Sequence, residues 1–172
     1  DAKGLLKQAI RLDNPVIYFE HKLLYQTRGE VPDGDVTIPF GEAVVRRAGE
    51  AVTIVAWQDM LRRTLKAADR LSQEGIEVEI IDPRTLNPFD RDTIIESVKK
   101  TGACIVVEEA YRTLGVGAEI GAMLLEAALP YMDKPFKRLA IPDVPIPTSQ
   151  HLVDAIVPSV DDIYQAVKEL TD

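Results

Sequence analysis

The chain has 172 residues, of which 46% are hydrophobic, and a formal net charge of -8. This length suffices for one well-buried domain with a small additional element, but not for two full domains. The acidic balance argues against a sequence-independent grip on nucleic acid or on an anionic membrane, because both need a basic surface. The acidic balance is compatible with a basic protein partner.

The single cysteine, Cys104, lies in the apolar run 103–107, where we expect a core residue and no disulfide framework. No stretch approaches the ~18 uninterrupted apolar residues of a membrane-spanning helix. These features predict a cytoplasmic protein. The chain does not begin with methionine, so we expect it to be part of a longer or processed protein.

The first 40 residues predict one short unit and a linker. Apolar residues at helical spacing predict a helix over 3–12, and Pro15 excludes the helical conformation at Asn14. Residues 16–19 predict a strand. One helix and one strand cannot bury both of their apolar faces, so we expect the end of a domain whose earlier part is missing. Glycines and prolines among charged residues predict a linker over 22–40.

From Gly41 onward, strands and helices alternate. The predicted strands cover residues 43–46, 52–56, 78–81, 103–107 and 136–141, and the predicted helices cover 60–73, 90–100, 117–129 and 160–170. Asp90 is a candidate N-cap, and Gly102 is a candidate helix stop. This alternation predicts right-handed crossovers and a mostly parallel sheet covered on both faces, a three-layer α/β/α fold.

Three glycines after the predicted strand 103–107 raise the possibility of a nucleotide-binding turn. Gly115, Gly117 and Gly121 have the spacing G-x-G-x-x-x-G, one residue away from the dinucleotide fingerprint. Seven residues also separate the strand from the first glycine. We therefore favour a structural role for these glycines, which would allow the loop to turn tightly and the following helix to pack closely. A stand-alone nucleotide- or flavin-binding α/β domain is the alternative, which nucleotide titration would test.

Glu108 and Glu109 follow the same predicted strand, with Tyr111 and Arg112 just beyond them. Open α/β sheets usually carry their sites at the carboxyl ends of strands. Acid catalysis would need a second group with a shifted pKa, and the sequence places neither that group, a metal-ligand spacing nor a nucleophile beside them. We expect Glu108 and Glu109 to lie in a subunit interface rather than in a catalytic site.

The two histidines, His21 and His151, are far apart in the chain and predict surface or capping roles. Ser149, His151 and Asp154 include the residue types of a hydrolase triad. They lie within one local segment, however, and lack the strand-turn-helix setting that exposes a nucleophile. We do not expect a triad.

Several ordered motifs give the chain a recognisable resemblance. They are the stretch 1–25, RGEVP at 28–32, DPRTLNP at 82–88, GVGAEI at 115–120 and DVPIP at 143–147. In this order the motifs resemble those of beta subunits of thiamine-diphosphate-dependent 2-oxo acid dehydrogenases of the pyruvate dehydrogenase type. Transketolases and deoxyxylulose phosphate synthases are related alternatives, which carry all the cofactor-binding domains on one long chain.

The resemblance implies three segments: residues 1–21 as the tail of a pyrimidine-binding domain, 22–40 as an interdomain linker and 41–172 as a transketolase C-terminal-like domain. It implies oxidative decarboxylation of pyruvate or a related 2-oxo acid, with acyl transfer to a lipoyl group. Thiamine diphosphate and magnesium would bind elsewhere in the full enzyme, so no catalytic or cofactor-binding residue is assigned here. The implied partners are an alpha subunit, a second beta subunit and a lipoyl acyltransferase core.

The resemblance also implies two sites in the chain itself. The helix end near Leu12 leaves carbonyl groups without helical partners, which by itself indicates only capping. In the family this helix end holds potassium, which carries over to the carbonyls of Ala9, Ile10, Leu12 and Asn14, with Leu12 replacing an aspartate of some relatives. An acidic patch that docks the acyltransferase carries over to Asp133 and Asp172, across a one-residue length difference.

Overall fold

The computed structural model describes residues 1–171. The helices are α1 (Ala2–Arg11), α2 (Gln58–Ser72), α3 (Arg91–Thr101), α4 (Val116–Ala127), α5 (Gln150–Asp154) and α6 (Val160–Thr171), with 3-10 turns η1 (Lys22–Leu24) and η2 (Leu129–Tyr131). The strands are β1 (Val44–Arg47), β2 (Thr53–Ala56), β3 (Glu79–Asp82), β4 (Cys104–Tyr111) and β5 (Lys137–Ile141). The predicted elements of the region after residue 41 are all present, with shifted ends.

The five strands form one sheet in the order β1-β3-β2-β4-β5. β2, β3, β4 and β5 are parallel, whereas β1 pairs antiparallel with β3 at the edge. All four residues of β2 and of β3 are buried. Strands covered on both faces are rich in apolar residues, as 54–56 of β2 and 80–81 of β3 are. The expected mostly parallel α/β sheet is confirmed.

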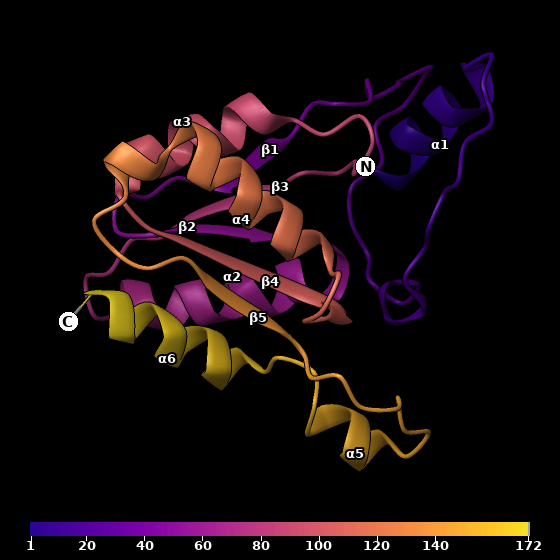
Figure 1. Ribbon diagram of the computed structural model, residues 1–172. Helices are drawn as coiled ribbons and strands as arrows, with labels where there is room; N and C mark the ends of the chain where they lie inside the picture. The colour runs from indigo at the N-terminus through magenta and orange to yellow at the C-terminus, as the bar shows by residue number, and fades with distance from the viewer. Residues whose placement is uncertain (172) are drawn as a thin grey trace.

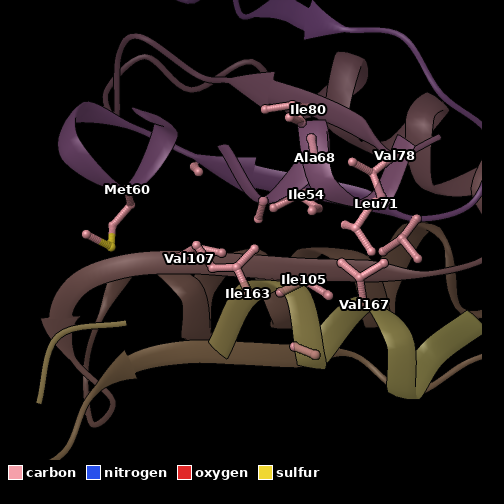
Figure 2. Close-up of a cluster of buried hydrophobic side chains, with 14 of the residues drawn as sticks. Ile54, Met60, Ala68, Leu71, Val78, Ile80, Ile105, Val107, Ile163 and Val167 are labelled. Carbon is pink, nitrogen blue, oxygen red and sulfur yellow. The ribbon is translucent and has the colours of Figure 1, made fainter. Parts of the chain in front are cut away.

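Helices cover both faces of the sheet (Figure 1). On one face α2 and α6 pack on Ile54 and Ile105 through residues such as Leu71 and Ile163, as Figure 2 shows. On the other face α3 and α4 pack on a second core that includes Val55. Ile54 and Val55 therefore face opposite layers, as consecutive strand residues must. The result is the predicted three-layer arrangement.

The ends of α3 follow the predicted chemistry. The Asp90 side chain accepts a hydrogen bond from the Thr93 amide at 3.1 Å, which satisfies one of the free donors of the first turn. At the other end Gly102 adopts a left-handed conformation with φ 69°. Glycine takes this conformation without steric cost. Both predicted boundary signals are confirmed.

Residues 1–40 lie beside the sheet with little regular structure after α1 (Figure 1). The amide of Ile38 donates to the carbonyl of Gly4, and Lys7 and Arg11 both pair with Asp35. Hydrogen bonds from Lys7 and Arg11 lower the pKa of Asp35 to about 2. These contacts hold α1 against the segment that we predicted to be a linker.

The predicted strand over 16–19 is wrong for this structure. Those residues pair with no strand, and Ile17 and Phe19 are 81% and 77% exposed. A strand needs a neighbour to satisfy its backbone groups and to cover its apolar side chains. Within residues 1–171 no such neighbour is present.

Among the helices of residues 1–171, none is long and apolar enough to cross a membrane.

Candidate functional site

The carboxyl ends of the parallel strands gather the unusual backbone of this protein. Among residues 1–171, three non-glycine residues have positive φ, and each follows a different strand: Gln58 after β2 (52°), Arg84 after β3 (56°) and Leu114 after β4 (62°). Such conformations cost free energy in non-glycine residues and cluster at functional sites. Residues 1–40 approach this same edge (Figure 1). We call this end of the sheet, where the parallel strands finish, the carboxyl edge. It is the candidate functional surface.

Glu108, on β4, is fully buried beneath the amino terminus of α4. The amide of Gly117 donates to both of its carboxylate oxygens, at 3.1 and 3.0 Å. The positive end of the helix dipole favours an anion at this position. Burial nevertheless raises the pKa of Glu108, although the Gly117 amide and the positive charge of Arg138 act in the opposite direction.

The glycines near the start of α4 make room for this carboxylate. A Cβ on Gly117 would stand 2.5 Å from Oε1 of Glu108, and a Cβ on Gly115 would stand 2.9 Å from it. Gly121 is crowded instead by the ring of Phe136. In a dinucleotide fold this helix terminus receives a phosphate. Here Glu108 occupies it, which supports the packing role of the glycines over the nucleotide-binding alternative.

Glu109 points away from Glu108 and reaches the surface. Its Oε2 lies 2.8 Å from Nε2 of His21, which joins the predicted linker to β4. A cavity of about 470 Å³ adjoins this pair and is lined by Tyr111, Leu114 and Ile146 among others. Leu114 is 95% exposed. The edge thus combines a hydrogen bond between His21 and Glu109 with exposed apolar side chains.

The two glutamates predicted to lie in an interface therefore differ in position. Only Glu109 is accessible from outside the chain; the side chain of Glu108 supports the loop from within. His21 has the predicted capping role, because its Nδ1 accepts from the Leu23 amide at the start of η1. Sequence reasoning missed its contact with Glu109, because nothing in the local pattern indicates a partner 88 residues away. It also missed Arg138 of β5, which lies close to Glu108 and Gly117.

Other candidate residues do not assemble into a catalytic site. Ser149 is the N-cap residue just before the short helix α5, His151 is exposed, and Asp154 accepts from Gln150 instead. No hydrogen bond joins Ser149, His151 and Asp154 in the described chain. Cys104 is buried, and burial raises the pKa of its thiol. An unreactive core thiol is what this setting favours.

The predicted potassium ligands lie where α1 ends. α1 stops at Arg11, and Leu12 has an extended conformation with ψ 138°. Among residues 1–171, no backbone or side-chain donor is hydrogen-bonded to the carbonyl oxygens of Ala9, Ile10, Leu12 or Asn14. Carbonyl oxygens without donors suit a hard cation. No cluster of three or more histidine, cysteine or acidic side chains suited to a metal occurs in residues 1–171.

Asp133 is exposed in the loop after η2. Its amide donates to the carbonyl of Gly102 at 2.9 Å, which fixes the loop against the end of α3. This loop precedes β5, so it lies at the amino ends of the parallel strands, opposite the edge that carries His21 and Glu109. Asp172, the other predicted docking residue, lies outside the described residues.

Comparison with known proteins gives this fold a family. A profile described as "Transketolase, C-terminal domain" matches residues 41–163, which include every strand and the first turn of α6. The chain belongs to the transketolase C-terminal domain family. Glu108, Gly117 and Asp133 all lie within the matched residues.

Curated relatives extend the match to nearly the whole chain. It is 43% identical to the pyruvate dehydrogenase E1 component subunit beta of Rickettsia felis, over 99% of this chain and 52% of that protein. It is 44% identical to the acetoin:2,6-dichlorophenolindophenol oxidoreductase subunit beta of Cupriavidus necator, over 98% of this chain and 50% of that protein. The chain spans about half the length of these relatives.

Solved structures agree with the fold. A split-gene transketolase, described as an inactive beta4 tetramer, superposes with a TM-score of 0.70 at 29% identity, over 83% of this chain and 45% of that one. A 2-oxoglutarate:ferredoxin oxidoreductase from Magnetococcus marinus superposes with a TM-score of 0.52 at 16% identity, over 76% of this chain and 19% of that one. The second likeness bears on the fold alone.

Proposed function

We propose that the chain is the carboxy-terminal part of the beta subunit of a thiamine-diphosphate-dependent 2-oxo acid dehydrogenase, and that its role is assembly. The observation that carries the proposal is the identity above 40% to beta subunits along nearly the whole chain. The segments proposed from the resemblance are 1–21, 22–40 and 41–172. Thiamine diphosphate and magnesium are assigned to other parts of the enzyme, and we place the enzyme in the cytoplasm.

The geometry supports an assembly role at the carboxyl edge. Leu114 projects almost completely into solvent from a backbone conformation that costs energy. An exposed leucine beside Tyr111 and Ile146 is unfavourable unless another surface covers it. Glu109 and His21 add a polar pair at the same place. A second beta subunit is the occupant that we propose for this edge.

The helix end after α1 has the donor chemistry of a potassium site. Its carbonyl oxygens at Ala9, Ile10, Leu12 and Asn14 accept no protein hydrogen bonds in the described chain. A bound ion would interact with these carbonyl oxygens in place of hydrogen bonds from water. Because Leu12 contributes only its backbone, the absence of a carboxylate there does not prevent binding.

The proposed docking surface for a lipoyl acyltransferase core lies at the opposite end of the strands. Asp133 is exposed there, and the net charge of -8 favours a basic partner. Lys134 follows Asp133 directly, so the patch is of mixed charge rather than uniformly acidic. Charge complementarity at such a surface governs association rate and salt dependence more than raw affinity.

The experiment that tests this function is reconstitution of activity. The protein that carries this chain is mixed with a candidate alpha subunit, thiamine diphosphate and magnesium, and substrate-dependent reduction of 2,6-dichlorophenolindophenol, the electron acceptor, is measured. Pyruvate, branched-chain 2-oxo acids and acetoin are compared as substrates. Activity only in the mixture supports the proposal. Activity of the protein alone would favour a transketolase-like enzyme, in which one chain carries all cofactor-binding domains.

A further inference from the structure

Leu114 stands on the rim of the cavity at the carboxyl edge. Its side chain is 95% exposed, and the cavity of about 470 Å³ beside it is lined mainly by apolar surface. Tyr111 and Ile146 contribute to that lining and are themselves 41% and 53% exposed. A protruding apolar side chain and an apolar cavity therefore lie side by side on one surface.

The two residues before Leu114 are held in place by contacts within the chain. The Arg112 amide donates to the carbonyl of Ile141 at 2.8 Å. Asp143 accepts from both the amide and the hydroxyl of Thr113, at 3.3 and 2.5 Å. The loop that presents Leu114 is thus tied to the segment that follows β5, which also carries Ile146.

The residue after Leu114 closes the loop from the other side. A Cβ on Gly115 would clash with the carbonyl oxygen of Tyr111, so the backbone turns tightly here. Leu114 itself has φ 62°, a conformation that costs free energy in a bulky residue. Because contacts on both sides hold this conformation, the Leu114 side chain is in position before any partner binds. A group that is already ordered binds without the entropy cost of ordering it.

The position of Leu114 beside the cavity indicates what kind of partner covers them. In a two-fold dimer both subunits use the same patch, so residue i of one meets residue j of the other and the reverse. A protrusion and a cavity on different faces would instead build an open chain of subunits. Here they share one patch, which a second copy can cover in a closed dimer. An apolar cavity of about 150 Å³ already holds benzene, so this cavity has room for a leucine side chain.

We propose that Leu114 of each beta subunit fills the cavity beside Tyr111 and Ile146 of a second beta subunit, and that Asp143 positions Leu114 for this contact. The reciprocal contact rests on the proposed function, which supplies the second beta subunit as the partner. It adds which side chains meet and places the two-fold axis beside Leu114. Removing these exposed apolar side chains from water on both subunits favours association.

Disulfide formation between two variants tests the contact. The protein that carries this chain is coexpressed as Leu114→Cys and as Ile146→Cys, assembled with the alpha subunit and oxidised mildly. Each chain has only one of the two substitutions, so a disulfide that joins positions 114 and 146 links two chains. Such a bond forms only where the Cα atoms lie within about 7 Å. Cys104 is buried and should not compete.

Peptide mass spectrometry should detect the disulfide between positions 114 and 146. Leu125→Cys replaces Leu114→Cys in the control, because Leu125 is 61% exposed on α4 but does not line the cavity, and it should give no disulfide with position 146. No disulfide in an assembly that is active in the reconstitution assay would overturn the reciprocal contact and leave the proposed function standing. An equal yield in the control would also overturn it. The parent protein, assayed in parallel, reports separately on the proposed function.

Variants of Asp143 test its positioning role. Asp143→Ala should weaken association of beta subunits about tenfold, because hydrogen bonds to a charged group are worth about that much. Asp143→Asn keeps an acceptor for the Thr113 amide and a donor for its hydroxyl oxygen, so it should associate nearly as the parent does. Sedimentation velocity over a dilution series measures both dissociation constants, and melting temperatures control for folding. Equal association of the parent and Asp143→Ala would overturn the positioning role.

Discussion

The Gly117 amide donates to both carboxylate oxygens of Glu108, so that an acidic side chain of β4 caps the helix that follows it. The contact links the central strand to α4 across a loop that exposes Leu114. Glycine at position 117 leaves room for this contact, because a Cβ there would stand 2.5 Å from Oε1 of Glu108. The shape of the candidate edge therefore depends on a buried polar contact.

Replacing Glu108 by glutamine should change how stability depends on pH. Because burial raises the pKa of Glu108, the folded protein holds the proton to a higher pH than the unfolded chain does. The contribution of Glu108 is then fully present below its ordinary pKa and is lost as pH rises through the folded value. The free energy of unfolding of the parent minus that of Glu108→Gln should fall from acidic to neutral pH in urea titrations. A difference that rises over this range contradicts the assignment.

Gly117→Ala should destabilise the fold by about 1–3 kcal/mol, the usual cost of overpacking. The added Cβ would stand 2.5 Å from Oε1 of Glu108 and 3.0 Å from Cδ of Arg138. Gly29→Ala is the matched control, because a Cβ there meets nothing within 4 Å. Urea midpoints measure both changes. Equal stability of the two variants would show that the α4 start can move to accept the methyl group.

Asp59→Asn should cost about 2 kcal/mol or more. Asp59 is fully buried in the first turn of α2 and accepts from Nε of Arg62 and Arg63, at 2.8 and 2.9 Å. Asparagine cannot carry the charge that pairs with Arg62 and Arg63, and its buried amide offers one acceptor oxygen in place of two. Asp69→Asn, on the exposed side of the same helix, should change stability by less than about 0.5 kcal/mol.

The pH dependence of the Asp59 variant adds a second check. Burial alone would raise the pKa of Asp59, but hydrogen bonds and charge from Arg63 and Arg62 outweigh it and hold the pKa below its ordinary value. Its contribution is present above the ordinary pKa and is lost as pH falls through the folded value. The stability gap between parent and Asp59→Asn should therefore narrow in acid. A gap that widens there would refute this reading.

Leu114→Asp should disrupt self-association at the carboxyl edge while leaving the fold intact. Aspartate tolerates the left-handed backbone that Leu114 adopts, and the side chain is 95% exposed, so folding should not suffer. Leu125→Asp is the control, since Leu125 is 61% exposed on α4, away from the cavity. Sedimentation velocity should show smaller species for Leu114→Asp alone. Unchanged sedimentation would remove Leu114 from the interface.

Charge reversal by Asp133→Lys should weaken binding to the acyltransferase core and leave decarboxylation with an artificial acceptor intact. The side chain of Asp133 is exposed, and the loop is fixed through its backbone amide rather than its carboxylate. Surface plasmon resonance at two salt concentrations would show both the loss and its electrostatic origin. The prediction fails if the two proteins bind the core with equal affinity.

The sequence was informative where local chemistry decides structure. Runs of apolar residues predict buried strands such as β2. Asp90 and Gly102 predict the ends of α3, because capping is a local interaction. The carboxyl edge was harder to predict from the sequence. The pairing of His21 with Glu109 spans 88 residues, and no pattern distinguishes Leu114 as a residue with positive φ. The predicted strand over 16–19 failed because pairing depends on a neighbouring strand.

The most direct test of the assembly role is native mass spectrometry of the protein that carries this chain, alone and mixed with a candidate alpha subunit. The proposal predicts a stable complex that contains two copies of each subunit, and loss of that complex in Leu114→Asp but not in Leu125→Asp. If the parent protein never associates with an alpha subunit or with a second copy of itself, the assembly role is contradicted.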